Sequence, residues 1–413
     1  MGVRHVVTAA VLVLGIGSAA GAEQTSPKVT FTIDVAPIFY KHCVECHRPT
    51  MFAPMPLVTF EEARPWARAV KQRVVAREMP PWHADPSVGE FKNDPRLSQR
   101  EIDTIAAWVD AGAPKGNDKD LPPRPQFVDG WTIGKPDVVL TMSEPFAIPA
   151  SGAVPYQYIK IPTNLSEDRW IKAIEIKPGS RAHVHHVIAY TQPAGLPGRS
   201  ERPLGRTNIG GTTPNKPGVV FGDGIARLLR ANSDIVLQMH YTTNGSAASD
   251  TTSVGLIFAK EPPKKMAAGG MALNIRLRIP PGAPNHEVSA TYTFLEDSVL
   301  TSMTPHMHVR GKDMKYVAHY PDGRSETLLF VPKYNFEWQL SYQLAQPKPM
   351  PKGTKLEVIA HFDNSPNNKF NPDHTKEVRW GDQTWEEMMI GFFGTVADAA
   401  AVTTEAKPPR QQR

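Results

Sequence analysis

The two cysteines of the chain, Cys43 and Cys46, stand three positions apart in the stretch HCVECHRPT, and His47 follows directly. The pattern C-x-x-C-H is typical of c-type haem attachment, in which the thiols bond to the porphyrin vinyl groups and the histidine is the proximal iron ligand. A zinc half-site and a redox-active dithiol are the alternatives. Zinc would need a second ligand pair, and a dithiol would need no histidine. The motif therefore predicts a covalently attached haem c held by Cys43, Cys46 and His47.

A haem of this kind needs a sixth ligand, and our candidate is Met79 in the stretch REMPPWH. A thioether ligand raises the haem potential toward that of an electron carrier, and the two prolines after Met79 favour a loop that could present it. His83 is the second candidate, and Met51 and Met55 are also near in sequence. Plain packing is the alternative role for any one of these methionines.

A helix should follow and close over the haem. Ser98 and Glu101 form a capping box, and Gly112 with Pro114 predicts the helix end. Apolar residues repeat at helical spacing between these signals, at Ile102, Ile105, Ala106 and Val109. We therefore predict that residues 23–115 form a small all-α cytochrome c domain.

Most histidines beyond this segment fall into three tight groups. These are His183, His185 and His186 in RAHVHHVIAY, then His240 in the strand-like run IVLQMHYTTNG with Gln238, then His306 and His308 in TPHMHVRGKDM. Side chains two positions apart on a strand point to the same face, so His306 and His308 could share one metal ion. Groups of neutral imidazoles suit copper, zinc, iron or nickel.

A methionine pair, Met388 and Met389, lies about eighty residues after the third group, in WGDQTWEEMMIGFFGTV. A thioether beside imidazoles would favour copper that cycles through Cu(I). Buried packing in an apolar strand is the alternative, and residue types alone leave both open. The remaining histidines of this region are isolated and are assigned structural or surface roles: His286, His319, His361 and His374.

The elements that must position these groups are predominantly strands. A length of 413 residues with 40% hydrophobic content allows two or three domains, and 40 prolines with 30 glycines indicate short strands joined by turns. The turn YPDGR between KYVAHY and ETLLFV predicts a hairpin within a sandwich. A faint echo, FAIPASG and later LRIPPG, precedes histidines in each half and suggests two related β-domains, 137–265 and 266–400.

The remaining segments are a linker and two ends. Residues 116–136 are rich in proline and charge and predict a linker, and the polar tail 401–413 is predicted to be disordered. Residues 1–22 combine Arg4, a short apolar run and an Ala-Gly-Ala ending, which predicts a signal peptide and a periplasmic or secreted protein. No later run is long enough for a transmembrane segment. The formal charge of +5, with 46 basic and 41 acidic residues intermixed, argues against nucleic acid as a partner.

The order of these groups resembles a known family. His-His, a histidine in QMHY, His-x-His and then EEM is the ligand order of the ascorbate-dependent type II copper monooxygenases, which include the peptidylglycine α-hydroxylating and dopamine β-monooxygenases. The resemblance covers roughly residues 137–400. It implies two jelly-roll-like β-sandwich domains of eight or nine strands each, with one copper each across a solvent-filled cleft. The ligands it implies are His185, His186 and His240 for the electron-transferring copper, and His306, His308 and Met388 for the oxygen-binding copper.

One conflict concerns the first group. On a regular strand, His183 and His185 would share a face and His186 would point away. The family pattern instead pairs His185 with His186, which requires a β-bulge or a strand end. We follow the family pattern and keep His183 as a residue that supports the ligands.

Other departures bear on the substrate. The peptide-amidating relatives place an arginine, an asparagine and a tyrosine where this chain has Thr304, Ile390 and Phe392. A substrate carboxylate would be buried there without a partner, which is costly. We therefore expect that the substrate is not a peptide ending in glycine. The disulfides of the animal enzymes are also absent.

The resemblance implies a copper-dependent monooxygenase that hydroxylates a C–H bond of a small molecule with O2. Its electrons would come from ascorbate or another external reductant, and the attached cytochrome suggests a relay from an exported donor through the haem. Two alternatives remain: a copper and haem protein that transfers electrons or binds copper without oxygenating anything, and a zinc-binding β-sandwich in which Met388 only packs. Both keep the histidine ligands.

Overall fold

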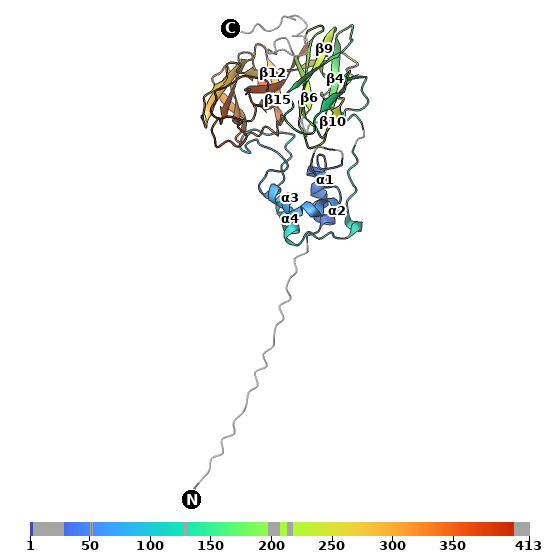
Figure 1. Ribbon diagram of the computed structural model, residues 1–413, viewed down its shortest axis with the longest axis vertical. Helices are drawn as coiled ribbons and strands as arrows, with labels where there is room; N and C mark the ends of the chain where they lie inside the picture. Colours follow the sequence, from blue (N-terminus) through green and yellow to red (C-terminus); the bar gives the residue numbers. More distant parts are fainter. Residues whose placement is uncertain are drawn as a thin grey trace.

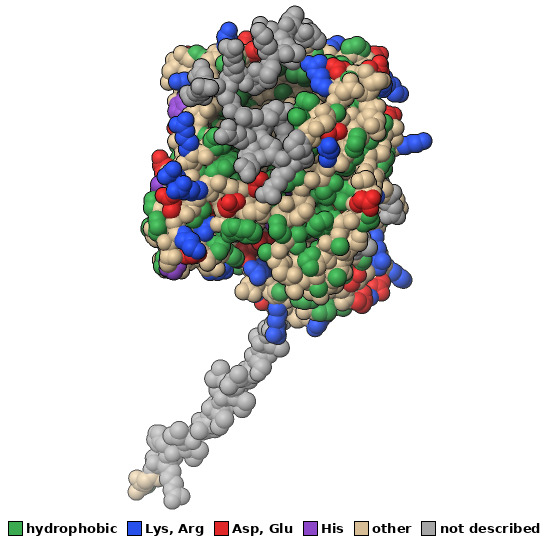
Figure 2. Space-filling model, turned by 45° about the horizontal axis from the view of Figure 1, so that its top comes forward, with side chains coloured by type: hydrophobic (Ala, Val, Ile, Leu, Met, Phe, Trp, Pro, Cys, Tyr) green, Lys and Arg blue, Asp and Glu red, His purple; other side chains and the backbone are tan. Residues whose placement is uncertain are grey.

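The computed structural model describes residues 1–2, 29–49, 51, 53–127, 130–196, 207–212 and 218–399. The expected tail and almost all of the expected signal peptide lie outside the described residues. The helices form one group, and two β-rich regions lie side by side next to it (Figure 1). Within the described residues, no helix has both the length and the apolar character needed to cross a membrane. On the face shown in Figure 2, acidic and basic side chains are interspersed.

The helical region contains short helices packed around their own core. Their bounds are η1 Phe31–Val35, α1 Ala36–His42, α2 Phe60–Ala63, η2 Arg64–Trp66, α3 Ala67–Val75, α4 Gln99–Asp110 and η3 Asp118–Asp120. The predicted capping box is confirmed, since Ser98 and Glu101 bond reciprocally at the start of α4. The buried residues of α4 are Ile102, Ile105 and Trp108, so the core position after Ile105 is Trp108 and Ala106 is only partly buried. The identity of this region as a cytochrome stays a prediction.

The rest of the described chain is mainly β-sandwich. Its largest sheet has nine strands: β1 (Val138–Thr141), β11 (Ser253–Phe258), β4 (Arg169–Lys177), β8 (Ile225–Leu229), β12 (Lys265–Leu273), β21 (Ile390–Asp398), β15 (Ser298–His306) and β18 (Tyr342–Met350) in that order, with β7 (Val219–Val220) beside β4. A four-stranded sheet covers each half of it.

The two covering sheets belong to different halves of the chain. The first comprises β3 (Gln157–Pro162), β9 (Ser233–Tyr241), β5 (Val184–Pro193) and β6 (Thr207–Thr212), and the second comprises β14 (His286–Thr293), β19 (Lys355–Phe362), β16 (Gly311–His319) and β17 (Ser325–Val331). Two short pairs complete the described sheets: β2 (Phe146–Ile148) with β10 (Ala248–Asp250), and β13 (Arg278–Ile279) with β20 (Val378–Arg379).

Each sandwich has its own hydrophobic core. The first core joins β5 and β9 to β4 and β11, and the second joins β16 and β19 to β15 and β21. The two halves are not fully separate, however, because β8 pairs with β12 in parallel and makes their outer sheets one continuous sheet. The expected boundary at residues 265 and 266 falls at the first residue of β12. The predicted hairpin is confirmed, since β16 and β17 pair antiparallel around a turn that contains Gly323 with φ of 86°.

Part of the expected cytochrome segment packs on the second sandwich. We call residues 82–93 the strap. Trp82 and Ala84 belong to the second sandwich core, and the Trp82 ring lies 4.7 Å from the ring of Tyr342. Backbone hydrogen bonds then run between the strap and β18, from Lys92 N to Gln343 O and from Ala345 N to Glu90 O. The segment 23–115 is therefore not self-contained, because the strap buries its apolar side chains against β18 and covers that sheet edge.

The expected linker 116–136 also makes contacts with the helical region and with the first sandwich. In its described part, Phe127 lies under the guanidinium of Arg48, 3.9 Å from the ring centroid. Nearer the first sandwich, the backbone N–H groups of Thr132 and Ile133 donate to the carboxylate of Glu175. The helical region is thus held against the second sandwich by the strap between α3 and α4, and against the first sandwich by the segment that follows it.

We expect Trp82→Ala to destabilise the second sandwich, although residue 82 lies in the segment expected to be a separate domain. Trp82 is buried against Tyr342 and Phe91, and removing a buried Trp side chain costs about 3–5 kcal/mol. Chemical denaturation followed by circular dichroism would measure the loss. An exposed tryptophan of the helical region, Trp66, is the control, and Trp66→Ala should change stability by less than about 0.5 kcal/mol. Equal small effects of both substitutions would contradict the docking of the strap.

Candidate metal centre

The first histidine group is built by a β-bulge. In the pairing of β5 with β9, Val184 faces Tyr241 and His186 faces His240, so His185 is the extra residue on β5. The sequence conflict is resolved in this way, because a bulge redirects neighbouring side chains to one side of a strand. His185, His186 and His240 converge, with one ring nitrogen of each lying within 4.8 Å of the others.

His183 does not belong to this cluster. Its Nδ1 lies 2.8 Å from Ser180 Oγ and its Nε2 lies 2.9 Å from Asn244 Oδ1. Because an amide oxygen only accepts, Nε2–H donates to Asn244 and Nδ1 accepts from the serine hydroxyl. Both ring nitrogens of His183 are therefore occupied, and the residue supports the start of β5.

The ring nitrogens that face inward in the first group are the Nδ1 atoms. His186 Nδ1 lies 3.0 Å from His185 Nδ1 and 3.4 Å from His240 Nδ1. The outer nitrogen of His185, Nε2, donates to the carbonyl of Glu337 at 3.0 Å. This hydrogen bond leaves the lone pair of His185 Nδ1 free to bind a metal.

The second histidine group lies at the end of β15. The rings of His306 and His308 are nearly perpendicular, with centroids 5.4 Å apart. His306 Nδ1 donates to Gln339 Oε1 at 2.6 Å, and His308 Nδ1 donates to the carbonyl of Glu386 at 3.2 Å. In both rings Nδ1 is used by the protein, so Nε2 is the nitrogen that can ligate.

The structure separates the two adjacent methionines. Met389 is fully buried in the second sandwich core, whereas Met388 is not part of that core cluster. His306 pairs with Ile390 in the antiparallel register of β15 and β21, and continuing this register outward brings position 308 opposite position 388. His308 follows the end of β15 and Met388 precedes β21, and both backbone N–H groups donate to the same Glu387 oxygen, so the two segments are adjacent there and Met388 is a candidate thioether ligand beside the two imidazoles.

Glu387, the residue directly before Met388, is fully buried. Its carboxylate accepts from the backbone N–H groups of His308, Arg310 and Met388. Burial raises the pKa of Glu387 to about 8, although these hydrogen bonds act in the opposite direction.

The two histidine groups share two aromatic rings. The ring of Tyr156 stacks on His240 at 4.7 Å and lies 6.4 Å from His308, and its hydroxyl is 3.5 Å from His186 Nε2. The ring of Phe336 lies 5.6 Å from His240 and 5.9 Å from His308. Aromatic rings therefore lie beside both groups, and the solvent-filled cleft between the two sites stays a prediction.

Burial also sets the protonation of these imidazoles. It lowers the pKa of His240 to about 3, of His306 to about 4 and of His308 to about 3, and it lowers the pKa of His186 well below its ordinary value. The rings are therefore neutral at pH 7, which is the form that binds a metal. The donor set of both groups thus fits copper, and the thioether near the second favours Cu(I) there.

The haem-attachment motif lies directly after α1. Cys43 caps the helix, and its carbonyl accepts from the N–H groups of Cys46 and His47. His47 Nδ1 donates to the carbonyl of Met55 at 3.0 Å, which leaves Nε2 for an iron ion. Burial raises the pKa of Cys43 to about 12 and of Cys46 to about 11, whereas a redox-active dithiol needs a lowered pKa. The two free thiols and the oriented imidazole fit a covalent haem.

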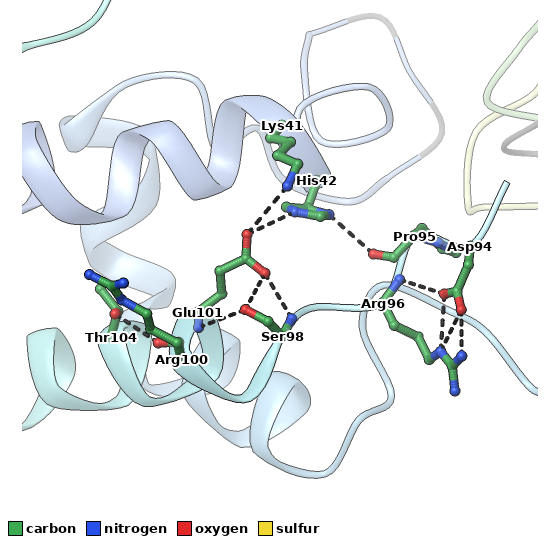
Figure 3. A network of polar contacts seen from close by, with 9 residues as sticks. All are labelled: Lys41, His42, Asp94, Pro95, Arg96, Ser98, Arg100, Glu101 and Thr104. Carbon is green, nitrogen blue, oxygen red and sulfur yellow. Dashed lines mark hydrogen bonds and ion pairs between the residues drawn. The ribbon is translucent and has the colours of Figure 1, made fainter. Parts of the chain in front are cut away.

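A polar network holds α1 in place. Figure 3 shows His42, the residue before Cys43, between Glu101 of α4 and the carbonyl of Pro95. Glu101 also completes the capping box with Ser98, and Lys41 lies within 3.6 Å of the same carboxylate. The end of α1, directly before the C-x-x-C-H motif, is thereby fixed to α4 and to the short segment between the strap and α4.

The two candidates for the sixth haem ligand lie in different surroundings. Met79 is half-buried in the loop that follows α3. His83 instead lines a small cavity with Pro305, Tyr334 and Tyr342 of the second sandwich, and its buried Nε2 has no hydrogen-bond partner among the described residues. The surroundings of His83 are supplied by the sandwich, which favours Met79 as the haem ligand.

We expect Met79→Ala to lower the haem midpoint potential by on the order of 0.1 V, because a thioether ligand raises that potential. His83→Ala should leave the potential unchanged, since His83 contacts the second sandwich. Spectroelectrochemical titration of both variants would measure the difference. A larger shift in His83→Ala than in Met79→Ala would reverse the assignment.

Several residues of the site carried no sequence signal. Tyr156 precedes β3, while Phe336, Glu337 and Gln339 lie between β17 and β18. The departures expected to shape the substrate pocket do lie near the second group. The Phe392 ring is 6.0 Å from His306, Ile390 is buried, and the Thr304 hydroxyl donates to Ser341.

No family model matches the sequence, and no curated protein matches it. Among solved structures, the chain has 8% identity and a TM-score of 0.27 with the major capsid protein P2 from Bacteriophage PM2, over 63% of this chain and 98% of that one. The STIV MCP gives 9% identity and a TM-score of 0.28 over 65% and 99% of the chains. An allantoicase from Saccharomyces cerevisiae gives 8% identity and a TM-score of 0.16 over 53% and 80%. Likenesses at this level establish neither a shared fold nor a shared activity.

Proposed function

We propose that this chain is an exported copper-dependent monooxygenase with a c-type haem, which hydroxylates a C–H bond of a small molecule with O2. The observation that supports it most is the pair of ligand groups beside the same aromatic rings. One group has three converging imidazoles, and the other has two imidazoles with a methionine on the adjacent segment before β21. In this proposal the sandwiches are jelly-roll-like domains and the helical region is a cytochrome c.

Copper held by these residues would supply the one-electron chemistry that such a hydroxylation requires. The reaction consumes R–H, O2, two electrons and two protons, and it yields R–OH and water. Glu337, Gln339 and Glu386 each accept a hydrogen bond that fixes one imidazole. Burial lowers the pKa of four of the histidines and keeps them neutral, namely His186, His240, His306 and His308. The rings of Tyr156 and Phe336 lie beside both groups.

The electrons would come from ascorbate or another external reductant, or from an exported donor through the haem to the group of His185, His186 and His240. Docking of the helical region supports the second route. The strap pairs with β18, and His83 shares a cavity lining with Pro305, which directly precedes His306. The haem-binding segment is thus packed against the sandwich that carries the second ligand group, and the chain that follows it is bonded to the first sandwich through Thr132, Ile133 and Glu175.

The substrate would be small and uncharged at the position where the reaction occurs. Phe392 and Ile390 present apolar surface near His306, and the Thr304 hydroxyl is engaged with Ser341. The buried Arg310 donates to Asn364 and to the carbonyl of Trp385. A carboxylate beside His306 would therefore lack a charged partner.

The test is the metal and haem content of the protein made in a host that attaches haem c and then supplied with copper. We expect about two copper ions per haem iron, falling to about one in His306→Ala or Met388→Ala. Zinc in place of copper, or copper content that ignores both substitutions, would overturn the proposal. Oxygen uptake coupled to substrate loss then separates a monooxygenase from a copper protein that only transfers electrons.

A further inference from the structure

The ligand residues of the second group come from two segments far apart in the chain, and one buried carboxylate bridges them. Glu387 Oε2 accepts from His308 N at 2.8 Å and from Met388 N at 3.2 Å, while Oε1 accepts from Arg310 N at 2.7 Å. His308 and Arg310 follow the end of β15, and Met388 precedes β21. Two of these bonds thus join the segment of Glu387 to the segment of His308 and Arg310, and the third fixes the carboxylate against Met388, its own neighbour.

The backbone of Glu387 is held as firmly as its carboxylate. Its N–H donates to the carbonyl of Arg379, and its own carbonyl accepts from Gly381 N. A fully buried carboxylate is costly unless its oxygens are hydrogen-bonded. The presence of one here therefore indicates that its hydrogen bonds to the backbone have a role at this site. The guanidinium of Arg310 donates to Asn364 Oδ1 and to the carbonyl of Trp385, whereas its backbone N–H donates to the Glu387 carboxylate.

We propose that Glu387 is the positioning residue of the second metal site, holding the Met388 thioether within reach of the metal bound by His306 and His308. The proposal rests on the proposed copper site. The pairing between β15 and β21 ends at His306 and Ile390. Beyond that point the segments are joined by the Glu387 carboxylate and by the bonds from His308 to the Glu386 carbonyl and from Arg310 to the Trp385 carbonyl. Without the carboxylate, the segment carrying Met388 would lose its two bonds to the backbone N–H groups of His308 and Arg310.

The deciding variant is Glu387→Gln. An amide has one oxygen, so its NH2 group must face at least one of the three backbone N–H donors, and the two segments should move apart. We expect the affinity of this site for cuprous ion to fall about 10- to 100-fold, as for other residues that orient metal ligands. The sulfur contribution to the copper X-ray absorption spectrum should fall, while copper bound by His185, His186 and His240 should remain.

The adjacent residue provides the matched control. The Glu386 carboxylate accepts from Gln383 N, but the contact of Glu386 with His308 is made by its backbone carbonyl. Glu386→Gln should therefore keep the sulfur contribution and an affinity within about twofold of the wild type. A Glu387→Gln protein with the same sulfur contribution and affinity as this control would overturn the proposal.

A second variant and a wild-type measurement cover the cases in which Glu387→Gln does not fold or the copper site is absent. If Glu387→Gln does not fold, as judged by circular dichroism, Glu387→Asp keeps both oxygens but withdraws them by one methylene. A reduced sulfur contribution in that variant supports the proposal, and an unchanged one overturns it. Failure of the proposed function is recognised separately, because wild-type protein given cuprous ion alone would then show no sulfur contribution at all.

Discussion

Met388→Leu is expected to abolish substrate hydroxylation while leaving the fold intact. A metal ion that stabilises charge in the transition state contributes several kcal/mol, so losing its thioether ligand should reduce the rate by roughly a thousandfold. Leucine matches methionine closely in volume, and such exchanges usually cost less than about 1.5 kcal/mol of stability. Oxygen uptake and product formation, measured with a substrate that the wild-type protein hydroxylates, would show the effect, and copper content would be measured beside them.

The neighbouring methionine is the control. Met389 packs in the second sandwich core and lies outside the ligand group, so Met389→Leu should keep activity within about twofold and keep both coppers. The pair has the same chemistry and adjacent positions, so a difference between them reports on ligation alone. Equal activity in Met388→Leu and Met389→Leu would show that Met388 only packs.

The parts of this structure that the sequence predicted are those governed by local chemistry. The capping box of α4 and the hairpin of β16 and β17 follow from residues within a few positions of one another. The bulge at His185 was also predictable, because strict alternation and the ligand pattern could not both hold on a regular strand. A local conflict of this kind marks a site that the fold must accommodate.

The parts that sequence reasoning missed depend on contacts between distant segments. Glu337 meets His185 across 152 positions, and nothing in its own neighbourhood indicates that contact. The strap is a second example. Trp82 lies amid helix and loop signals, yet it packs in a β core whose sandwich residues begin only at Ala272. Trp108 was missed for a different reason, since spacings of three and four residues are both compatible with one helix face.

The second large effect is expected from removing the haem. In a protein with both Cys43→Ala and Cys46→Ala, haem should no longer remain attached under denaturing conditions, because both thioether bonds are lost. Electron delivery from an exported donor should then fall to background. Turnover driven by ascorbate should stay within about twofold of the wild type, because the copper-ligand candidates lie on β5, β9, β15 and the segment before β21. Turnover with reduced cytochrome c as a surrogate donor, compared with turnover with ascorbate, would measure the two routes.

The exposed residue between the cysteines gives the control. Glu45 forms an ion pair with Arg48 at the surface, so Glu45→Ala should keep the haem and both routes. Rapid mixing adds the kinetic criterion, since ferrous haem in the wild-type protein should reduce copper faster than free ascorbate does. If it does not, the haem is not the electron relay, and the strap that joins the helical region to β18 has a structural role only. If it does, the dense packing around Trp82 and His83 becomes functional, because electron transfer requires the fixed distance between haem and copper that a docked strap maintains and a free linker could not.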